Sequence, residues 1–108
     1  MKEAELAKYA KAALARSGLV HWRCSNGPVL HNIGPRTIMK RSQIAGFPDW
    51  AGISPKGMFW AMELKTAKGK VEPHQQDWID KINFSYGMAE VARSFEEIDN
   101  FIDRVMDT

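Results

Sequence analysis

The fold depends most on residues 58–66, whose sequence is Met58-Phe59-Trp60-Ala61-Met62-Glu63-Leu64-Lys65-Thr66. The run is apolar and aromatic and follows a turn at residues 54–57, a combination typical of a β-strand. Side chains alternate between the two faces of a strand. We therefore expect Glu63 and Lys65 to share one face near the end of this strand.

Two explanations account for an acid and a base among these apolar neighbours. Partly burying charges costs free energy unless they pair or bind something, so Glu63 and Lys65 form either a same-face ion pair or part of a functional site. The sequence Gly46-Phe47-Pro48 predicts a turn into a second strand that begins near Asp49. A hairpin of the two strands would bring Asp49 beside Glu63.

Two converging carboxylates suit a hard divalent cation. Mg²⁺ prefers oxygen ligands from one or two carboxylates and keeps open positions for water and a phosphate oxygen. A metal held by Asp49 and Glu63 would lower the pKa of a bound water, while Lys65 could orient that water and stabilise an anionic transition state. The pattern therefore predicts hydrolysis of a phosphodiester.

The remaining segments predict a small α/β domain that spans residues 1–108. We expect helices over 2–17, 73–86 and from Ser94 onward, and strands over 19–24, 88–92 and in the hairpin. Residues 25–43 lack periodicity and contain Gly-Pro pairs, which favours a long loop with a possible short strand near 37–40. The expected order is αβββαβα.

Two polar residues lie on helix faces that should point inward. Gln75 has helical spacing with Trp78 and Ile82, which indicates either a hydrogen bond near the metal site or a satisfied buried amide. Glu3 lies seven residues before Ala10 on the inward side of the first helix. It is either a further metal ligand, directly or through water, or a terminal carboxylate in solvent.

Composition narrows the class of protein. At 108 residues and 12.2 kDa with 44% hydrophobic residues, the chain has room for one compact domain. No apolar run approaches the roughly 18 residues of a membrane span, and the single cysteine, Cys24, cannot form an intrachain disulfide. These features predict an intracellular protein without a membrane segment.

The formal charge of +2 is unevenly distributed along the chain. Basic residues gather before Asp49 and just after Glu63, which is consistent with a surface that faces phosphates. The candidates for contacts with DNA are Arg23, Arg36, Lys40, Lys68 and Lys70. An ordinary solvated surface explains the charge equally well.

Three motifs follow one another along the chain: Gly46-x-Pro48-Asp49, Glu63-x-Lys65 and Pro73-x-Gln75-x-x-Trp78. This ordered set resembles the PD-(D/E)XK nucleases, and among them the stand-alone VRR-NUC domains of phages and bacteria. The likeness extends from Glu3-x-x-Leu6 to residues 87–94. It implies a restriction-endonuclease-like core, a mixed central sheet flanked by helices. It also implies dependence on Mg²⁺ or Mn²⁺ and a homodimer that cuts branched DNA such as Holliday junctions, in the cytoplasm of a bacterial or phage-infected cell.

The resemblance also assigns roles by position. Asp49, Glu63, Leu64 and Glu3 would form the metal set, Lys65 would be the catalytic lysine and Gln75 a supporting glutamine. The Val-Arg-Arg element that names the family is absent as such at residues 91–93, although Arg93 is kept with its role open.

Two competing interpretations remain at this point. The chain could be a DNA-binding module without catalysis, in which the carboxylates merely pair with Lys65. It could also be a nuclease with another substrate, such as nicked duplex, flaps or single strands.

Overall fold

The computed structural model describes residues 1–24, 29–40 and 44–108. Its elements, in chain order, are α1 (Glu3–Ser17), β1 (Val20–Arg23), β2 (Val29–Ile33), β3 (Arg36–Lys40), β4 (Trp50–Ile53), β5 (Phe59–Leu64), α2 (Pro73–Phe84), β6 (Met88–Ala92) and α3 (Phe95–Met106). No helix among the described residues is long and apolar enough to cross a membrane.

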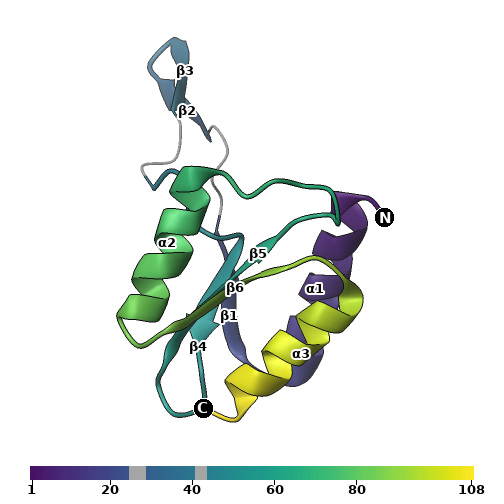
Figure 1. Ribbon diagram of the computed structural model, residues 1–108. Coiled ribbons are helices and arrows are strands. Elements are labelled where there is room, and N and C mark those ends of the chain that lie inside the picture. Colours follow the sequence, from purple (N-terminus) through teal and green to yellow (C-terminus); the bar gives the residue numbers. More distant parts are fainter. Residues whose placement is uncertain (25–28, 41–43) are drawn as a thin grey trace.

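A four-stranded sheet forms the centre of the molecule, in the order β1-β4-β5-β6. The pairs β1–β4 and β4–β5 are antiparallel, whereas β5 and β6 run parallel. Helices α1 and α3 lie on one face of the sheet and α2 lies on the other (Figure 1). The predicted mixed sheet flanked by helices is therefore confirmed.

The strand β5 separates two apolar clusters. Trp60, Met62 and Leu64 are buried among the side chains of α1 and α3. Ala61 and the partly buried Phe59 belong instead to a cluster with residues of α2. The expected alternation is therefore correct, and it places Glu63 on the α2 side of the sheet.

The hairpin of β4 and β5 has the register that the sequence predicted. Trp50 is paired with Met62, and Ile53 with Phe59. At its turn the Ser54 N–H donates to the Met58 carbonyl at 2.8 Å, and Gly57 adopts a φ of 92° that favours glycine. Because Asp49 precedes Trp50 and Glu63 follows Met62, the two acids lie on neighbouring strands.

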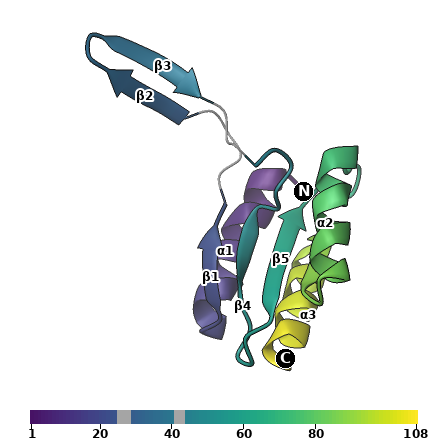
Figure 2. The ribbon, with the colours of Figure 1, turned by 90° about the vertical axis from the view of Figure 1, so that its left-hand side faces the viewer.

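The prediction of a long loop at 25–43 is wrong for residues 29–33, which form β2, whereas the possible short strand near 37–40 is confirmed as β3. Residues 25–28 and 41–43 of that prediction lie outside the described residues. Strands β2 and β3 form an antiparallel hairpin around Gly34 and Pro35, with Ile33 paired with Arg36, so the full element order is αβββββαβα. The hairpin projects away from the central sheet (Figures 1 and 2). It accounts for a radius of gyration of 15.0 Å, above the roughly 13 Å of a compact chain of this length.

Candidate active site

Asp49 is held at the start of β4 by hydrogen bonds on both sides. Its Oδ2 accepts a hydrogen bond of 2.8 Å from the N–H of Leu64 in β5. Its carbonyl accepts one of 2.7 Å from the N–H of Cys24, just beyond β1. These contacts fix the carboxylate of Asp49 beside the carboxyl end of β5.

Glu63 is a buried acid with an unused oxygen. Its side chain is 4% exposed, and its carboxyl is within hydrogen-bonding reach of Asp49. Gln75 Nε2 lies 3.5 Å from Oε1, while Oε2 has no hydrogen-bond partner among the described residues. A buried polar atom without a partner costs free energy, so Oε2 requires a proton or a ligand.

The electrostatics of the site favour a cation between the two acids. Burial raises the pKa of Glu63 most, the neighbouring charge of Asp49 and the hydrogen bond with it raise it further, and Glu3 adds to the effect. Lys65 acts in the opposite direction, and the resulting pKa is about 8. Near neutral pH the pair therefore keeps a proton that a divalent cation could replace.

The atoms around this pair fit a hard metal ion. Asp49 and Glu63 offer carboxylate oxygens, and Leu64 can offer only its backbone carbonyl because its side chain is apolar and buried. Among the residues that the structure describes, no three His, Cys, Asp or Glu side chains are gathered closely enough to hold a metal alone. Two carboxylates with a carbonyl and water match the usual environment of Mg²⁺ better than that of zinc.

A cavity of about 250 Å³ opens beside Asp49 and Leu64. Its other walls are Glu3, Ala4 and Ala7 of α1 and Arg23 of β1. Glu3 is exposed rather than turned into the core, but it lines this cavity and its charge acts on Glu63. The structure therefore brings Glu3 to the site as a neighbour of the two acids.

Gln75 connects the first turn of α2 with Glu63. Its Oε1 accepts a hydrogen bond of 2.9 Å from the N–H of Glu72, and its Nε2 faces Glu63 Oε1 at 3.5 Å. The neighbouring Gln76 is exposed and bonds to Asp80 at 2.8 Å. Of the two glutamines, Gln75 is therefore the inward one, as the helical spacing indicated.

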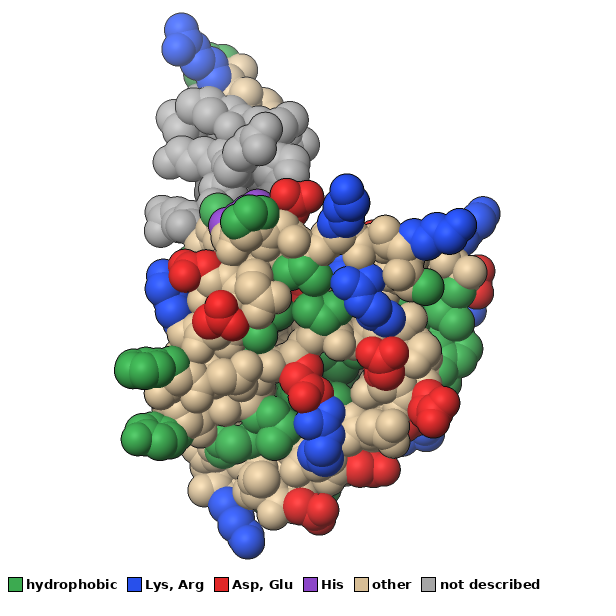
Figure 3. Space-filling view, viewed as in Figure 1, with side chains coloured by type: hydrophobic (Ala, Val, Ile, Leu, Met, Phe, Trp, Pro, Cys, Tyr) green, Lys and Arg blue, Asp and Glu red, His purple; other side chains and the backbone are tan. Residues whose placement is uncertain are grey.

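The predicted DNA contacts lie on three segments. Arg23 lines the cavity, with its guanidinium 5.8 Å from the centre of the Trp50 ring. Lys68 and Lys70 are exposed on the connection between β5 and α2. Lys and Arg side chains gather around the end of the molecule where this connection runs (Figure 3). Arg36 is exposed at the turn of the projecting hairpin, away from the acids, and the side chain of Lys40 lies outside the described residues.

Comparison with known proteins identifies the family. The model of the VRR-NUC domain matches residues 3–96 of the chain. The chain belongs to the VRR-NUC family. A solved structure described as a VRR_NUC domain is similar, with a TM-score of 0.66, 25% sequence identity and 94% of each chain covered. A search of the curated proteins gives no match.

Membership makes this chain a nuclease-type domain, and the structure shows what Arg93 does within it. The Nη1 group of Arg93 donates to the carbonyls of Thr66 and Gly69, both at 2.7 Å. Arg93 therefore connects the end of β6 with the loop that follows β5, the strand that carries Glu63. In this VRR-NUC domain the residue supports the loop that carries Lys68.

Replacing Arg93 with alanine is expected to lower the free energy of unfolding by about 1–3 kcal/mol, because two carbonyls would lose a charged donor. Urea denaturation would measure this loss. Arg93→Lys should lose less, since an ammonium can still reach one carbonyl. An alanine variant as stable as the wild type would show that the loop does not depend on this contact.

The sequence did not reveal all of the cavity walls of the VRR-NUC domain. Ala4 and Ala7 lie three residues apart on α1, so they share the helix face beside Glu3. Their small side chains leave the space in front of Asp49. The spacing was visible in the sequence, but alanines in a helix are too common to mark a site by themselves.

Proposed function

We propose that this chain is a divalent-metal-dependent, structure-selective endonuclease that hydrolyses phosphodiester bonds in branched DNA, and that it resolves Holliday junctions with Mg²⁺ or Mn²⁺. The convergence of Asp49 and Glu63 around the unpartnered Oε2 of Glu63 carries this proposal. Family membership supports the nuclease class.

Each residue of the site has a proposed task. Asp49, Glu63 and the carbonyl of Leu64 would hold the metal, with Glu3 contributing through water. When bound, the metal supplies a water of lowered pKa and offsets negative charge on the phosphate. Lys65, whose charge already acts on Glu63, would orient the attacking water and stabilise the charge that develops on the phosphate oxygens.

The basic residues would bind the DNA backbone. Arg23, which lines the cavity, would contact a phosphate there, and the exposed Lys68 and Lys70 would contact phosphates beside it. Arg36 and Lys40 on the projecting hairpin would reach more distant phosphates. Such contacts release counterions, so binding should weaken steeply as salt rises.

The substrate calls for two active sites. A four-way junction is resolved by cuts on two opposing strands, and a monomer of 12.2 kDa offers one site and little surface to hold the branches. A homodimer would supply the second site and the symmetry that paired cuts require.

Cleavage of a synthetic four-way junction beside a linear duplex of the same sequence tests the proposal. We expect paired cuts in the junction with Mg²⁺ or Mn²⁺, little cutting of the duplex and none with EDTA. Nicked, flap and single-stranded substrates form further arms of the experiment. Salt-sensitive binding without cutting in either metal would contradict the nuclease assignment, and preferential cutting of flaps or single strands would contradict the junction assignment.

Gln75→Ala is expected to slow cleavage by roughly 10–100-fold, because Glu63 would lose the amide that positions it. Gln76→Ala is the matched control, since the adjacent Gln76 is exposed and bonds only to Asp80 among the contacts described. Single-turnover rates on the junction would measure both variants. Equal rates for the two would remove Gln75 from the proposed site.

A further inference from the structure

The cavity beside Asp49 lies on the other side of the sheet from the side chain of Glu63. Glu63 is on the α2 side, whereas α1 and Leu64, whose side chain packs with α1 and α3, provide walls of the cavity. A metal between the two acids would therefore border this space without filling it. Pockets for drug-sized ligands measure roughly 300–1,000 Å³, so a cavity of about 250 Å³ is sized for one smaller group.

Small apolar side chains line the cavity where it meets α1. Ala4 and Ala7 lie three residues apart on one face of the helix, and each contributes only a methyl group. Leu64, which is 2% exposed, adds an apolar wall from β5. Apolar walls favour an uncharged occupant, and the absence of longer side chains from α1 leaves room for a flat ring.

The charges around the cavity decide which part of a nucleotide it can take. Glu3 and Asp49 are acidic, and among the lining residues that the structure describes Arg23 is the only cation. A phosphate placed between Glu3 and the alanines would be repelled, whereas a neutral base would not. Arg23 is exposed, with its guanidinium 5.8 Å from the centre of the Trp50 ring, so it can bind the phosphate of a nucleotide whose base enters the cavity.

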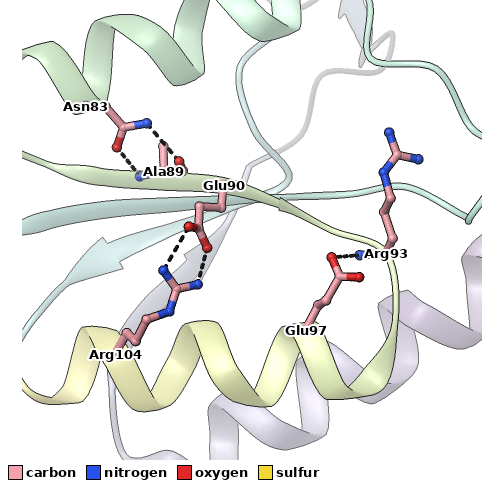
Figure 4. Close-up of polar contacts among 6 residues, drawn as sticks. All are labelled: Asn83, Ala89, Glu90, Arg93, Glu97 and Arg104. Atoms are coloured by element: carbon pink, nitrogen blue, oxygen red, sulfur yellow. Dashed lines mark hydrogen bonds and ion pairs between the residues drawn. The ribbon is translucent and has the colours of Figure 1, made fainter.

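A larger cavity, of about 510 Å³, lies at the outer edge of β6 between α2 and α3, and its charges do not suit DNA. Glu90 and Arg104, which both line it, form an ion pair (Figure 4). Glu97, a second acid in its wall, accepts a hydrogen bond from the Arg93 N–H. Two acids beside one arginine repel phosphates, so the smaller cavity is the better candidate for a nucleotide.

We infer that the smaller cavity, called here the base cavity, binds an unstacked nucleobase of the DNA strand that is cut. The inference rests on the proposed function. Asp49 and Leu64 line the base cavity and also belong to the proposed metal set. The base would therefore belong to a nucleotide adjacent to the scissile phosphate.

Binding of an unstacked base would explain a preference for branched DNA over linear duplex. A base has to leave its stack before it can enter the cavity, and this costs least where the base is mismatched, damaged or unpaired. At a branch point the stack is interrupted, so a base there leaves it more easily than a base within a continuous duplex. The alanines of α1 would thereby determine the specificity of the enzyme without contacting the metal.

Ala4→Leu tests the base cavity, because a leucine side chain would occupy the space while preserving the helix. Ala15→Leu is the matched control, since Ala15 is exposed on the same helix and does not line the cavity. Both variants should bind a four-way junction within about 3-fold of the wild type, because the basic residues that would contact phosphates are unchanged.

The first measurement is the fluorescence of 2-aminopurine, placed in turn at each nucleotide that flanks the branch point of a junction bound in Ca²⁺. The emission of this base analogue rises when it leaves the stack, and the aliphatic walls of the cavity would not quench it. We expect a several-fold rise at one position for the wild type and Ala15→Leu. Ala4→Leu should give no rise there.

The second measurement compares cleavage of the intact junction with cleavage of a junction that lacks the base at that position. Ala4→Leu should slow cleavage of the intact junction by roughly 10–100-fold relative to the wild type. On the abasic junction the two proteins should differ by less than about 3-fold, because no base then has to enter the cavity.

Several outcomes would overturn the inference. A wild type that gives no fluorescence rise at any position would do so even if it cuts the junction, and so would a rise that Ala4→Leu retains. Equal slowing of Ala4→Leu on intact and abasic junctions would place its effect on the metal site or the DNA backbone. If circular dichroism shows that Ala4→Leu is unfolded, Ala4→Met replaces it. A rise that Ala4→Leu abolishes, in a protein that cuts no DNA with Mg²⁺ or Mn²⁺, would support the base cavity and contradict the proposed function.

Discussion

Asp49→Ala is expected to reduce the rate of junction cleavage in Mg²⁺ by at least about 10³-fold while DNA binding stays within a few-fold of the wild type. The variant removes one of the two carboxylates that would hold the metal, and loss of such a group abolishes most of the stabilisation of the transition state. The basic residues that would bind phosphates are untouched. Single-turnover cleavage and a binding titration in Ca²⁺ would measure the two effects separately.

The matched control is Asp77→Ala. Asp77 is an exposed acid on α2 that forms an ion pair with Lys81 at 2.8 Å, a contact worth at most about 1 kcal/mol. Its removal should leave cleavage unchanged. Full activity of Asp49→Ala would contradict the proposed metal site. Equal losses of cleavage rate in both variants would indicate that removing any acidic side chain slows the reaction, and that position 49 has no special role.

Lys65→Ala should resemble Asp49→Ala in cleavage but not in metal affinity, because the proposed task of Lys65 is to act on the attacking water and the phosphate and not to hold the metal. A loss of cleavage without a loss of metal affinity would distinguish the proposed task of Lys65 from a purely structural ion pair with Glu63. The sequence alone left both explanations open. The charge of Lys65 lowers the pKa of Glu63 yet does not offset burial and Asp49, which favours a functional site over a simple ion pair.

The part of the fold that carries the candidate active site could be predicted because strong local rules act there. The alternation in β5 and the turn at residues 54–57 define a two-stranded register, and that register brings Asp49 to Glu63. Helical spacing likewise separated the inward Gln75 from the exposed Gln76. The contact between Leu64 N–H and Asp49 was not predictable, since it depends on the side-chain rotamer of an acid beyond the paired residues.

Of the projecting hairpin, the sequence predicted only a possible short strand near residues 37–40, and the pairing of β2 with β3 could not be predicted by the same rules. Strands β2 and β3 pair with each other and not with the central sheet, and residues 29–40 lack the regular apolar alternation that would mark two strands in the sequence. Gly34 and Pro35, which indicated a loop, form the turn between the two strands. The hydrogen bonds of Arg93 could not be predicted from the sequence either, because its two carbonyl partners lie more than twenty residues earlier in the chain.

The metal-free protein is expected to become less stable as pH rises from about 5 to 8. The folded-state pKa of Glu63 is about 8, above the ordinary value of 4.5. In this window the folded protein keeps a proton that the unfolded chain releases, so the free energy of unfolding falls with pH. We expect a loss on the order of 2 kcal/mol, measured by urea denaturation in EDTA.

Addition of Mg²⁺ or Mn²⁺ should reverse this loss, because a divalent ion binds the ionised pair and stabilises only the folded state. Glu63→Gln should remove both the decline with pH and the response to metal, since the amide does not ionise and is a poor replacement for a carboxylate ligand. Glu72→Gln, an exposed acid at the start of α2, should retain both effects. A wild type whose stability is independent of pH and metal would contradict a shared proton between Asp49 and Glu63, and with it the argument that a cation replaces that proton.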